Sequence, residues 1–360
     1  MPKTALGPLR EVLFSGQLAD GRYSRLFEQA LGEYLGNPHV TSHDNISTAL
    51  MLALYAAGVR PEDEVIASPI ACLATNQPIL NLFARVRWAD IDPLTGNLDP
   101  TGIASLITSR TKAILYAHWA GDVAEIDAIN RAAHMHGLKV IEDAGEALGA
   151  EYRGHRVGAT GTDFTVFSFH AIRHITTGEG AAIAYGDADM AEQTKWLKRY
   201  GIHQPSFRDE WGEIDPASDI PVAGFNSYMT NVAAALGLEQ MKYLPDIVSR
   251  HRKNGEFYDA SLSGISGLRL LRRLPHARSA YWVYTVLAER RDDLLRALRD
   301  RGVFASKVHV RNDIYSCFGE RRRALPGVDA FSARYLSLPC GWWVDEEVRE
   351  VVVAAIRRGW

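Results

Sequence analysis

Two adjacent acids at the end of an apolar run are the first feature of this chain that could support chemistry. Glu142 and Asp143 close the run KVIED (139–143), which has the composition of a buried strand. Buried acids are costly unless a positive group faces them, and a protonated ring nitrogen of a cofactor would be such a partner. The same acids could instead cap the next helix, so the pair alone leaves both interpretations open.

Three further stretches place polar side chains at turns. The turn DNISTAL (44–50) leads directly into a helix, whose free N–H groups suit a phosphate, although Ser and Asn also act as ordinary caps. The stretch FSFHAIRHITTGEG (167–180) ends a strand and continues through a polar turn with glycines that could wrap an anion. The turn GFNSYMTN (224–231) enters a long helix and could also be a cap. Each stretch could therefore bind an anion or serve only its own helix or turn.

Short strands alternate with helices from about residue 39 to 186, which is typical of a parallel sheet covered by helices on both faces. The helices STALMLALYAAG (47–58) and AEIDAINRAAHMHG (124–137) end at glycines. The expected strands are HVTSH (39–43), DEVIAS (63–68), RVRWAD (85–90), KAILYAH (112–118), KVIED (139–143), FTVFSF (164–169) and AAIAYG (181–186). Ligands of such sheets bind beyond the carboxyl ends of the strands, so residues just after each strand are the first candidates.

The remainder of the chain predicts a functional loop and a smaller domain. Residues 201–224 lack periodicity over a length that suggests a functional loop, and one long helix is expected over 230–252. Beyond it, we expect an antiparallel sheet with two helices. Its strands are LRLLR (268–272), YWVYTVLAE (281–289) and FASKVHV (304–310), and its helices are DDLLRALRDRG (292–302) and DEEVREVVVAAIRRGW (345–360). The predicted division is a large α/β domain over 1–250 and a small α+β domain over 251–360.

Composition favours a small-molecule ligand. The chain is 47% hydrophobic with a net charge of −3, and its interleaved charges leave no basic face for nucleic acid. The longest apolar runs are too short to span a bilayer. Cys72, Cys317 and Cys340 are odd in number and widely spaced, and the N-terminus lacks a secretory signal, so we expect a reducing cytoplasm. Metal-ligand spacings of Cys and His are missing from the sequence, which predicts no metal site.

Together these segments resemble the DegT/StrS family of nucleotide-sugar aminotransferases, in the same order along nearly the whole chain. The matching stretches include PEDEVIASP (61–69), ADIDPLTGNLDP (89–100), TSRTKAILYAHWAGD (108–122), VIEDAGEALGA (140–150), FSFHAIRHITTGEG (167–180), GFNSYMTNVAAALGLEQ (224–240) and SLPCGWWVDEEV (337–348). The resemblance implies the α/β fold of fold-type-I pyridoxal-phosphate enzymes, a three-layer sandwich with a mainly parallel sheet and a smaller C-terminal α+β domain.

The resemblance also implies roles for single residues. Asp143 would hold the pyridine nitrogen of the cofactor, and Ser47, Thr48 and Ser168 match phosphate-binding positions. Asn226 matches an asparagine that reaches the phosphate from the neighbouring subunit, which implies a homodimer that shares its active site. The family carries amino groups on pyridoxal or pyridoxamine phosphate and acts on nucleotide-linked keto sugars, usually with glutamate as donor.

The chain departs from the family pattern at its central position. In FSFHAxKxITTGEG the lysine forms the cofactor imine, and here Arg173 stands in its place. A guanidinium stays protonated, so it has no free amine to attack an aldehyde and cannot shuttle a proton. The other departures are Ile46 for glycine, Glu146 for glutamine or histidine, Ala181 for glycine and Cys72 for a stacking aromatic ring, although one subgroup carries cysteine there.

Natural divergence and a laboratory substitution could both explain Arg173, and the additional departures favour divergence. The family's sugar 3-dehydratases replace the same lysine by histidine and use free pyridoxamine phosphate. His174 could supply a base here, or it could be a structural residue of a subgroup pattern. We therefore predict noncovalent binding of pyridoxal or pyridoxamine phosphate and action on a nucleotide-linked keto sugar. The alternatives are a catalytically inactive pseudoenzyme or partner subunit, and an aminotransferase with an engineered lysine-to-arginine substitution.

The side chain of Arg173 must also find an anion, because an unpaired charge at the floor of a pocket would cost several kcal/mol. The expected partners are Glu146, Asp143, the cofactor phosphate, or a phosphate or carboxylate of the substrate. A side chain that points into bulk solvent would contradict this expectation.

Overall fold

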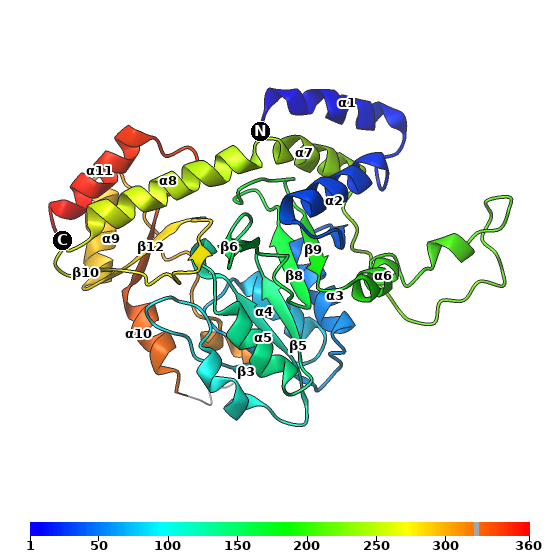
Figure 1. Cartoon of the computed structure of the whole chain (residues 1–360), viewed down its shortest axis with the longest axis horizontal. Coiled ribbons are helices and arrows are strands. Elements are labelled where there is room, and N and C mark those ends of the chain that lie inside the picture. Colours follow the sequence, from blue (N-terminus) through cyan, green and yellow to red (C-terminus); the bar gives the residue numbers. More distant parts are fainter. Residues whose placement is uncertain (320–323) are drawn as a thin grey trace.

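A seven-stranded sheet forms the centre of the computed structural model, which describes residues 1–319 and 324–360 (Figure 1). Its strands lie in the order β1-β9-β8-β5-β4-β2-β3; β9 runs antiparallel to β1 and β8, and the other pairs between β8 and β3 are parallel. The bounds are β1 Val40–His43, β2 Glu64–Ala67, β3 Arg85–Trp88, β4 Thr111–Ala117, β5 Lys139–Asp143, β8 Phe164–Ser168 and β9 Ala181–Tyr185. The expected mainly parallel sheet is confirmed.

Helices cover both faces of this sheet because successive side chains of a strand point to opposite sides. Val65 and Leu115 pack in one apolar cluster with helix α3, whereas Ile66 and Ile114 pack in another with helix α5. The helices of this region are α1 Leu6–Ser15, α2 Arg22–Leu35, α3 Ile46–Ala56, α4 Leu73–Asn81, α5 Ile126–His134 and α6 Ala188–Leu197. Both faces are therefore buried, as the apolar strand sequences require.

A small antiparallel sheet follows β5. It consists of β6 Glu151–Tyr152, β7 His155–Arg156 and β11 Ala277–Arg278, in the order β11-β6-β7. Because β11 comes from the C-terminal part of the chain, its pairing with β6 ties that part to the segment that follows β5.

The single long helix expected over 230–252 is wrong. The structure has two helices, α7 Asn231–Met241 and α8 Leu244–Leu262, separated at Lys242 and Tyr243. Pro245 lies in the first turn of α8, where its missing N–H costs nothing, but inside a continuous helix its ring would clash with the preceding turn. Proline therefore sets the break that the apolar periodicity concealed.

The C-terminal part of the chain contains the expected antiparallel sheet, with one correction. Its strands are β10 Leu268–Leu270, β12 Tyr284–Ala288 and β13 Tyr335–Leu338, and its helices are α9 Arg291–Asp300, α10 Pro326–Arg334 and α11 Glu346–Arg357. The strand expected over 304–310 is wrong, since the backbone of this segment pairs with the sheet as an isolated bridge between Ser306 and Ser337 and not as a strand. It leaves the sheet because Asn312 is anchored elsewhere, through its N–H to the carbonyl of Pro69 at 2.8 Å.

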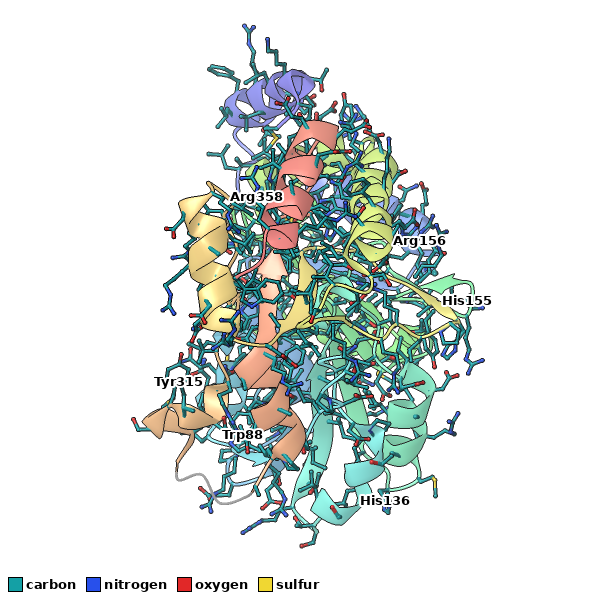
Figure 2. The ribbon with its side chains drawn as sticks, turned by 90° about the vertical axis from the view of Figure 1, so that its left-hand side faces the viewer. Trp88, His136, His155, Arg156, Tyr315 and Arg358 are labelled. Atoms are coloured by element: carbon teal, nitrogen blue, oxygen red, sulfur yellow. The ribbon has the colours of Figure 1, made fainter. Side chains whose placement is uncertain are left out.

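Helix α8 spans the predicted domain boundary at residue 251. Val248 belongs to the apolar cluster of the large sheet, whereas Tyr258 and Leu262 belong to the C-terminal cluster. Figure 2, seen from the side, shows α9, α10 and α11 in front of the large sheet. The division at residue 251 stays a prediction.

Residues 201–224 project from the body next to α6 (Figure 1). They form a loop with one short 3-10 helix, Gln204–Ser206, and the side chain of Trp211 at 81% exposure is almost free of contacts. Within the described ranges, we find no helix with the length and apolar character needed to cross a membrane. Those ranges also contain no group of three His, Cys, Asp or Glu side chains arranged to hold a metal ion.

Candidate functional site

Asp143 is a buried carboxylate at the carboxyl end of β5. Thr75 donates to its Oδ2 at 2.6 Å, and the N–H of Gly145 donates to its Oδ1 at 2.9 Å. Burial raises the pKa of Asp143 above its ordinary value of 3.8, although both hydrogen bonds act in the opposite direction. Among the side chains that the structure describes, no cation forms an ion pair with it. Arg173 lies near enough to lower the pKa of Asp143, but it forms no ion pair with this carboxylate in the described structure.

Glu142 has a different environment, although it is the neighbour of Asp143. Its side chain points to the other face of β5, where Tyr116 and Thr165 donate to it at 2.7 and 2.6 Å and His118 Nε2 lies 3.0 Å from its Oε1. The carboxylate is fully buried. Of the two acids at the strand end, Glu142 is hydrogen-bonded to side chains of the neighbouring strands β4 and β8, and Asp143 is the one that faces the site.

Arg173 lies in the turn after β8 and pairs with Glu146. The distance from Arg173 Nη1 to Glu146 Oε1 is 3.2 Å, and the two side chains are 8% and 12% exposed. The guanidinium carbon lies 4.4 Å from the ring centroid of Trp282, a cation–π contact. Of the anions expected to pair with Arg173, the structure shows Glu146, and the solvent-facing alternative is excluded.

Glu146 is held from several sides. The N–H of Ala120 donates to its Oε2 at 2.8 Å, and His309 Nε2 lies 2.7 Å from its Oε1. Burial alone would raise the pKa of Glu146, but His309 and then Arg173 outweigh it and lower the pKa below its ordinary value of 4.5. Glu146 is therefore an ionised carboxylate at neutral pH.

His174 is buried, at 3% exposure, and tied to the neighbouring chain segment. Its Nε2 lies 3.0 Å from the carbonyl oxygen of Ala280, and its ring centroid lies 4.5 Å from that of His251. Burial first, and then the neighbouring His251, lower its pKa well below 6.5. These contacts are those of a neutral structural histidine, and a role as base stays a prediction.

The turn before α3 caps this helix, and it contains a carboxylate, Asp44, that sequence reasoning missed. Asn45 accepts a hydrogen bond from the N–H of Thr48 at 3.0 Å, as a helix cap does. The hydroxyl of Thr48 donates to Asp44, and Ser227 donates to the same carboxylate oxygen. Asp44 thus takes hydrogen bonds at the helix end where a phosphate was expected, while Ser47 lies half-buried beside it.

Three expected elements of the site converge on Gly145. A Cβ at this glycine would lie 2.9 Å from Ile46 Cδ1, 3.0 Å from Asp143 Oδ1 and 3.2 Å from Ser168 Cβ. The ends of β5 and β8 therefore meet the start of α3, as the parallel sheet predicts. Asn226 is exposed and pairs only through its backbone with Arg199, so its expected role depends on a second subunit and stays a prediction.

Arg173 separates two cavities of very different size. The inner cavity has a volume of about 10 Å³, and the outer one about 830 Å³. The inner cavity is lined by Ala71, Cys72, Thr75, Ala117, His118, Trp119, Asp143, Glu146, Arg173 and His309. The outer one is apolar, with Ile172, Trp282, Trp342 and Trp343 in its wall. An inner volume of this size suits about one water molecule, whereas ligand sites usually measure roughly 300 Å³ or more.

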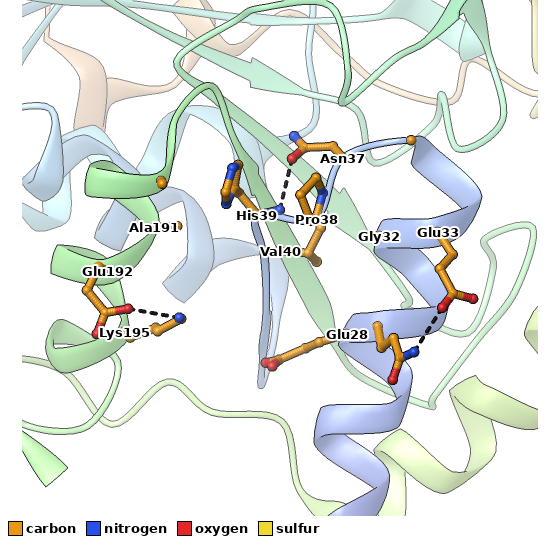
Figure 3. A pocket seen from close by; sticks show the side chains of 13 residues that line it. Glu28, Gly32, Glu33, Asn37, Pro38, His39, Val40, Ala191, Glu192 and Lys195 are labelled. Carbon is orange, nitrogen blue, oxygen red and sulfur yellow. Dashed lines mark hydrogen bonds and ion pairs between the residues drawn. The ribbon is translucent and has the colours of Figure 1, made fainter. Parts of the chain in front are cut away.

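A separate surface hollow between α2 and α6 does not belong to this site (Figure 3). Its acids already have partners: Glu33 accepts from Gln29 at 2.9 Å, and Glu192 pairs with Lys195 at 2.9 Å. The dashed lines in Figure 3 mark both contacts. These two acids therefore already have partners and do not call for a ligand.

The sequence and the fold agree on the family. The model of the DegT/DnrJ/EryC1/StrS aminotransferase family matches residues 2–357. The chain belongs to this family. GDP-perosamine synthase of Caulobacter vibrioides is 37% identical to it over 80% of this chain and 76% of the relative. The spore coat polysaccharide biosynthesis protein SpsC of Bacillus subtilis is 30% identical over 99% of this chain and 94% of the relative.

Solved structures confirm the fold of this DegT/StrS protein. The sugar aminotransferase CalS13 from Micromonospora echinospora has a TM-score of 0.95 at 33% identity, covering 100% of this chain and 98% of that one. DesV of S. venezuelae, solved in complex with a ketimine intermediate, has a TM-score of 0.91 at 28% identity, covering 99% and 94%. The fold-type-I architecture is therefore confirmed, and aminotransferases of this family depend on pyridoxal phosphate.

The cofactor of the family fits this site in chemistry but not in volume. Asp143 offers the carboxylate that a pyridinium needs, and Ser168 and α3 lie next to it. The inner cavity of about 10 Å³, however, leaves no room for a pyridine ring while Arg173 holds its described position. Cys72 lines the same cavity, and burial raises the pKa of its thiol.

Sequence reasoning missed four residues of this DegT/StrS site: Asp44, Thr75, Trp282 and His309. Asp44 was within the quoted turn but was not singled out. Thr75 lies in the first turn of α4, the helix that follows β2, so its place after a strand was only an indirect signal. Trp282 and His309 come from the C-terminal part of the chain, and no local pattern links them to Glu146.

Proposed function

We propose that this DegT/StrS protein binds pyridoxal or pyridoxamine phosphate noncovalently and acts on a nucleotide-linked keto sugar. The observation that carries the proposal is Asp143, whose buried carboxylate receives only neutral donors in the described structure. Arg173 is close enough to lower the pKa of Asp143 but forms no ion pair with it in the described structure. A pyridinium nitrogen would supply a directly paired positive charge, and buried charges are stabilised by such pairing. When bound, the cofactor supplies a protonated ring that withdraws electrons from a neighbouring carbanion.

The remaining cofactor contacts follow from the resemblance. Ser47, Thr48 and Ser168 would hold the phosphate, Cys72 would lie against the ring, and Asn226 would reach the phosphate from a second subunit. The convergence of Ser168 and Asp143 on Gly145 supports this arrangement. A homodimer that shares its site, and a cytoplasmic location, are parts of the same proposal.

Arg173 makes ordinary transamination unavailable in this proposal. The stretch 167–180 contains no lysine, and the guanidinium of Arg173 has no free electron pair with which to attack an aldehyde. Its pairing with Glu146 supports a structural role for this side chain. His174 would stabilise the fold through its contact with the carbonyl of Ala280 rather than act as a base. Burial lowers its pKa, so the ring is neutral at neutral pH.

The substrate class is supported by relatives of this chain. The name of GDP-perosamine synthase includes a nucleotide-linked sugar, and CalS13 is described as a sugar aminotransferase. A nucleotide-linked keto sugar is the substrate that matches both. The sugar, the nucleotide and the amino donor are not part of the proposal.

A specific observation favours a second function. The inner cavity of about 10 Å³ is what a pseudoenzyme or partner subunit would show, because such a protein has no need to admit the cofactor. Titration with pyridoxal phosphate and with pyridoxamine phosphate, followed by calorimetry and absorbance, separates the two. Saturable binding of one equivalent per chain supports the first function, and the pseudoenzyme requires that neither compound binds.

A companion measurement tests the noncovalent character. Wild-type protein saturated with pyridoxal phosphate is treated with borohydride and digested for mass spectrometry. We expect no stoichiometric phosphopyridoxyl group on any lysine. Full modification of one lysine, such as Lys195 or Lys198 on the following helix, would contradict the proposal.

A further inference from the structure

The structure shows a site that its own side chains close. We propose that the pair of Arg173 and Glu146 is a latch, and that the cofactor enters only when the side chain of Arg173 moves away from Glu146 into the outer cavity. This inference rests on the proposed function for the identity of the ligand. The latch itself is tested by variants whose outcome differs from that of the function.

The position of Arg173 between the two cavities is the first argument. The side chain lines both the inner cavity of about 10 Å³ and the outer cavity of about 830 Å³. It is therefore a partition between a space that is too small for a cofactor ring and a space that is large enough for a flexible side chain. Moving it outward enlarges the inner cavity without any change in the backbone.

The two ends of the latch differ in how firmly they are held. Glu146 is fixed by the N–H of Ala120 at 2.8 Å and by His309 at 2.7 Å. Arg173 has one ion pair and its contact with Trp282, and its buried Nε has no hydrogen-bond partner among the described residues. A buried donor without a partner is costly, so the closed state is held less firmly than a two-pronged arginine–carboxylate pair would be.

Trp282, on which Arg173 rests, is itself rigid. Its indole N–H donates to the carbonyl of Ile172 at 2.8 Å. The preceding residue, Tyr281, has a positive φ of 47°, and its ring packs so closely on Gly255 that a Cβ there would lie 2.3 Å from the ring. Surroundings that enforce such a strained backbone leave little freedom to the segment. The part that moves is therefore the side chain of Arg173.

Removing Arg173 leaves Glu146 with partners. The N–H of Ala120 and His309 still contact both of its oxygens, so the carboxylate is not left unpaired. Arg173→Ala should consequently fold, although breaking a buried pair costs stability. Arg291→Met is the control, since Arg291 is 12% exposed, pairs with Asp292 at 2.9 Å, belongs to α9 and lines neither cavity.

The experiment measures the Kd of pyridoxamine phosphate, which forms no imine with lysine, for wild type, Arg173→Ala, Glu146→Gln and Arg291→Met. We expect Arg173→Ala to bind at least tenfold more tightly than wild type. Glu146→Gln should bind more tightly as well, because a neutral amide releases the guanidinium. Arg291→Met should bind as wild type does, and circular dichroism verifies the fold of each variant.

The outcomes separate the latch from the function. If wild type binds and Arg173→Ala binds no more tightly, the latch is overturned and the proposed function stands. If wild type does not bind and Arg173→Ala does, the latch is supported and the noncovalent function is overturned in favour of the pseudoenzyme. If folded Arg173→Ala also fails to bind, both are overturned.

Discussion

Asp143 and Glu146 lie three residues apart in one short segment, yet their environments are opposite. Asp143 receives neutral donors and has a raised pKa, whereas Glu146 contacts His309 and Arg173 and has a lowered pKa. Glu146 forms an ion pair with Arg173, whereas Asp143 forms none in the described structure. The same cation, Arg173, therefore pairs with one of the two carboxylates and leaves the other to neutral donors.

Restoring lysine at position 173 should have the largest effect on cofactor chemistry. It would also remove the permanent charge that now pairs with Glu146 and not with Asp143. Arg173→Lys places an amine that can be deprotonated where the wild type has a permanent charge. We expect a stoichiometric borohydride-reduced adduct on Lys at this position and a measurable half-reaction with glutamate, followed by absorbance. Wild type should show neither.

The same variant tests the origin of Arg173. Full half-reaction by Arg173→Lys would indicate a recent loss or a laboratory exchange in an otherwise intact site. A variant that folds but binds no cofactor would show that Ile46 and Glu146 have closed the pocket, and would favour the pseudoenzyme.

Neutralising Asp143 should have the second largest effect. Asp143→Asn keeps the size of the side chain but removes the charge for a pyridinium, and charge-assisted hydrogen bonds contribute about 1.5–3 kcal/mol. We expect the Kd of pyridoxamine phosphate to rise about 100-fold in calorimetry. The control is Asp163→Asn, which alters a carboxylate paired with Lys139 at 2.7 Å at the start of β5 and should leave the Kd unchanged. Equal affinities of wild type and Asp143→Asn would remove Asp143 from the site.

Acid unfolding should distinguish the two carboxylates, because their contributions to the free energy of unfolding change with pH in opposite directions. Glu146 has a folded-state pKa below 4.5, so the stability that it contributes is present above pH 4.5 and is lost as the pH falls through its folded-state pKa. Asp143 has a folded-state pKa above 3.8, so its contribution is most favourable at low pH and declines as the pH rises from 3.8 through that pKa.

Urea unfolding of wild type, Glu146→Gln and Asp143→Asn between about pH 3 and 6 measures these slopes, which are at most about 1.4 kcal/mol per pH unit for one proton. We expect the stability of wild type relative to Glu146→Gln to fall on acidification. Relative to Asp143→Asn it should rise on acidification. Slopes of the same sign would mean that the two environments are not opposite.

The smallest expected effect concerns Asp44 at the start of α3. Asp44→Asn removes a negative charge from the helix end where the phosphate was expected, and should lower the Kd of pyridoxamine phosphate about threefold. Asp187→Asn, which alters the capping acid of α6, is the control and should leave the Kd unchanged. A weaker affinity of Asp44→Asn would show that Asp44 orders Thr48 and Ser227 for the phosphate instead.

Much of the fold was predictable because its signals are local. Strand runs such as 112–118 and 139–143 are apolar and β-branched, and helices such as 124–137 carry apolar residues at helical spacing and end at glycine. The rule that parallel strands place their carboxyl ends together then brought Asp143 and Ser168 to one place, and the structure confirms their proximity. The break at Pro245 had a local signal too, but the apolar periodicity was followed instead.

The sequence by itself determined which side chains could bind a cofactor, and that Arg173 cannot form an imine, because charge and acidity belong to the residue type. Only the tertiary structure decided what Arg173 does. Its partners Trp282 and Glu146, and the further contact from His309, come from segments far apart in the chain, brought together by the packing of the C-terminal part onto the sheet. Whether a buried carboxylate holds its proton or loses it depends on such distant neighbours, and no local pattern records them.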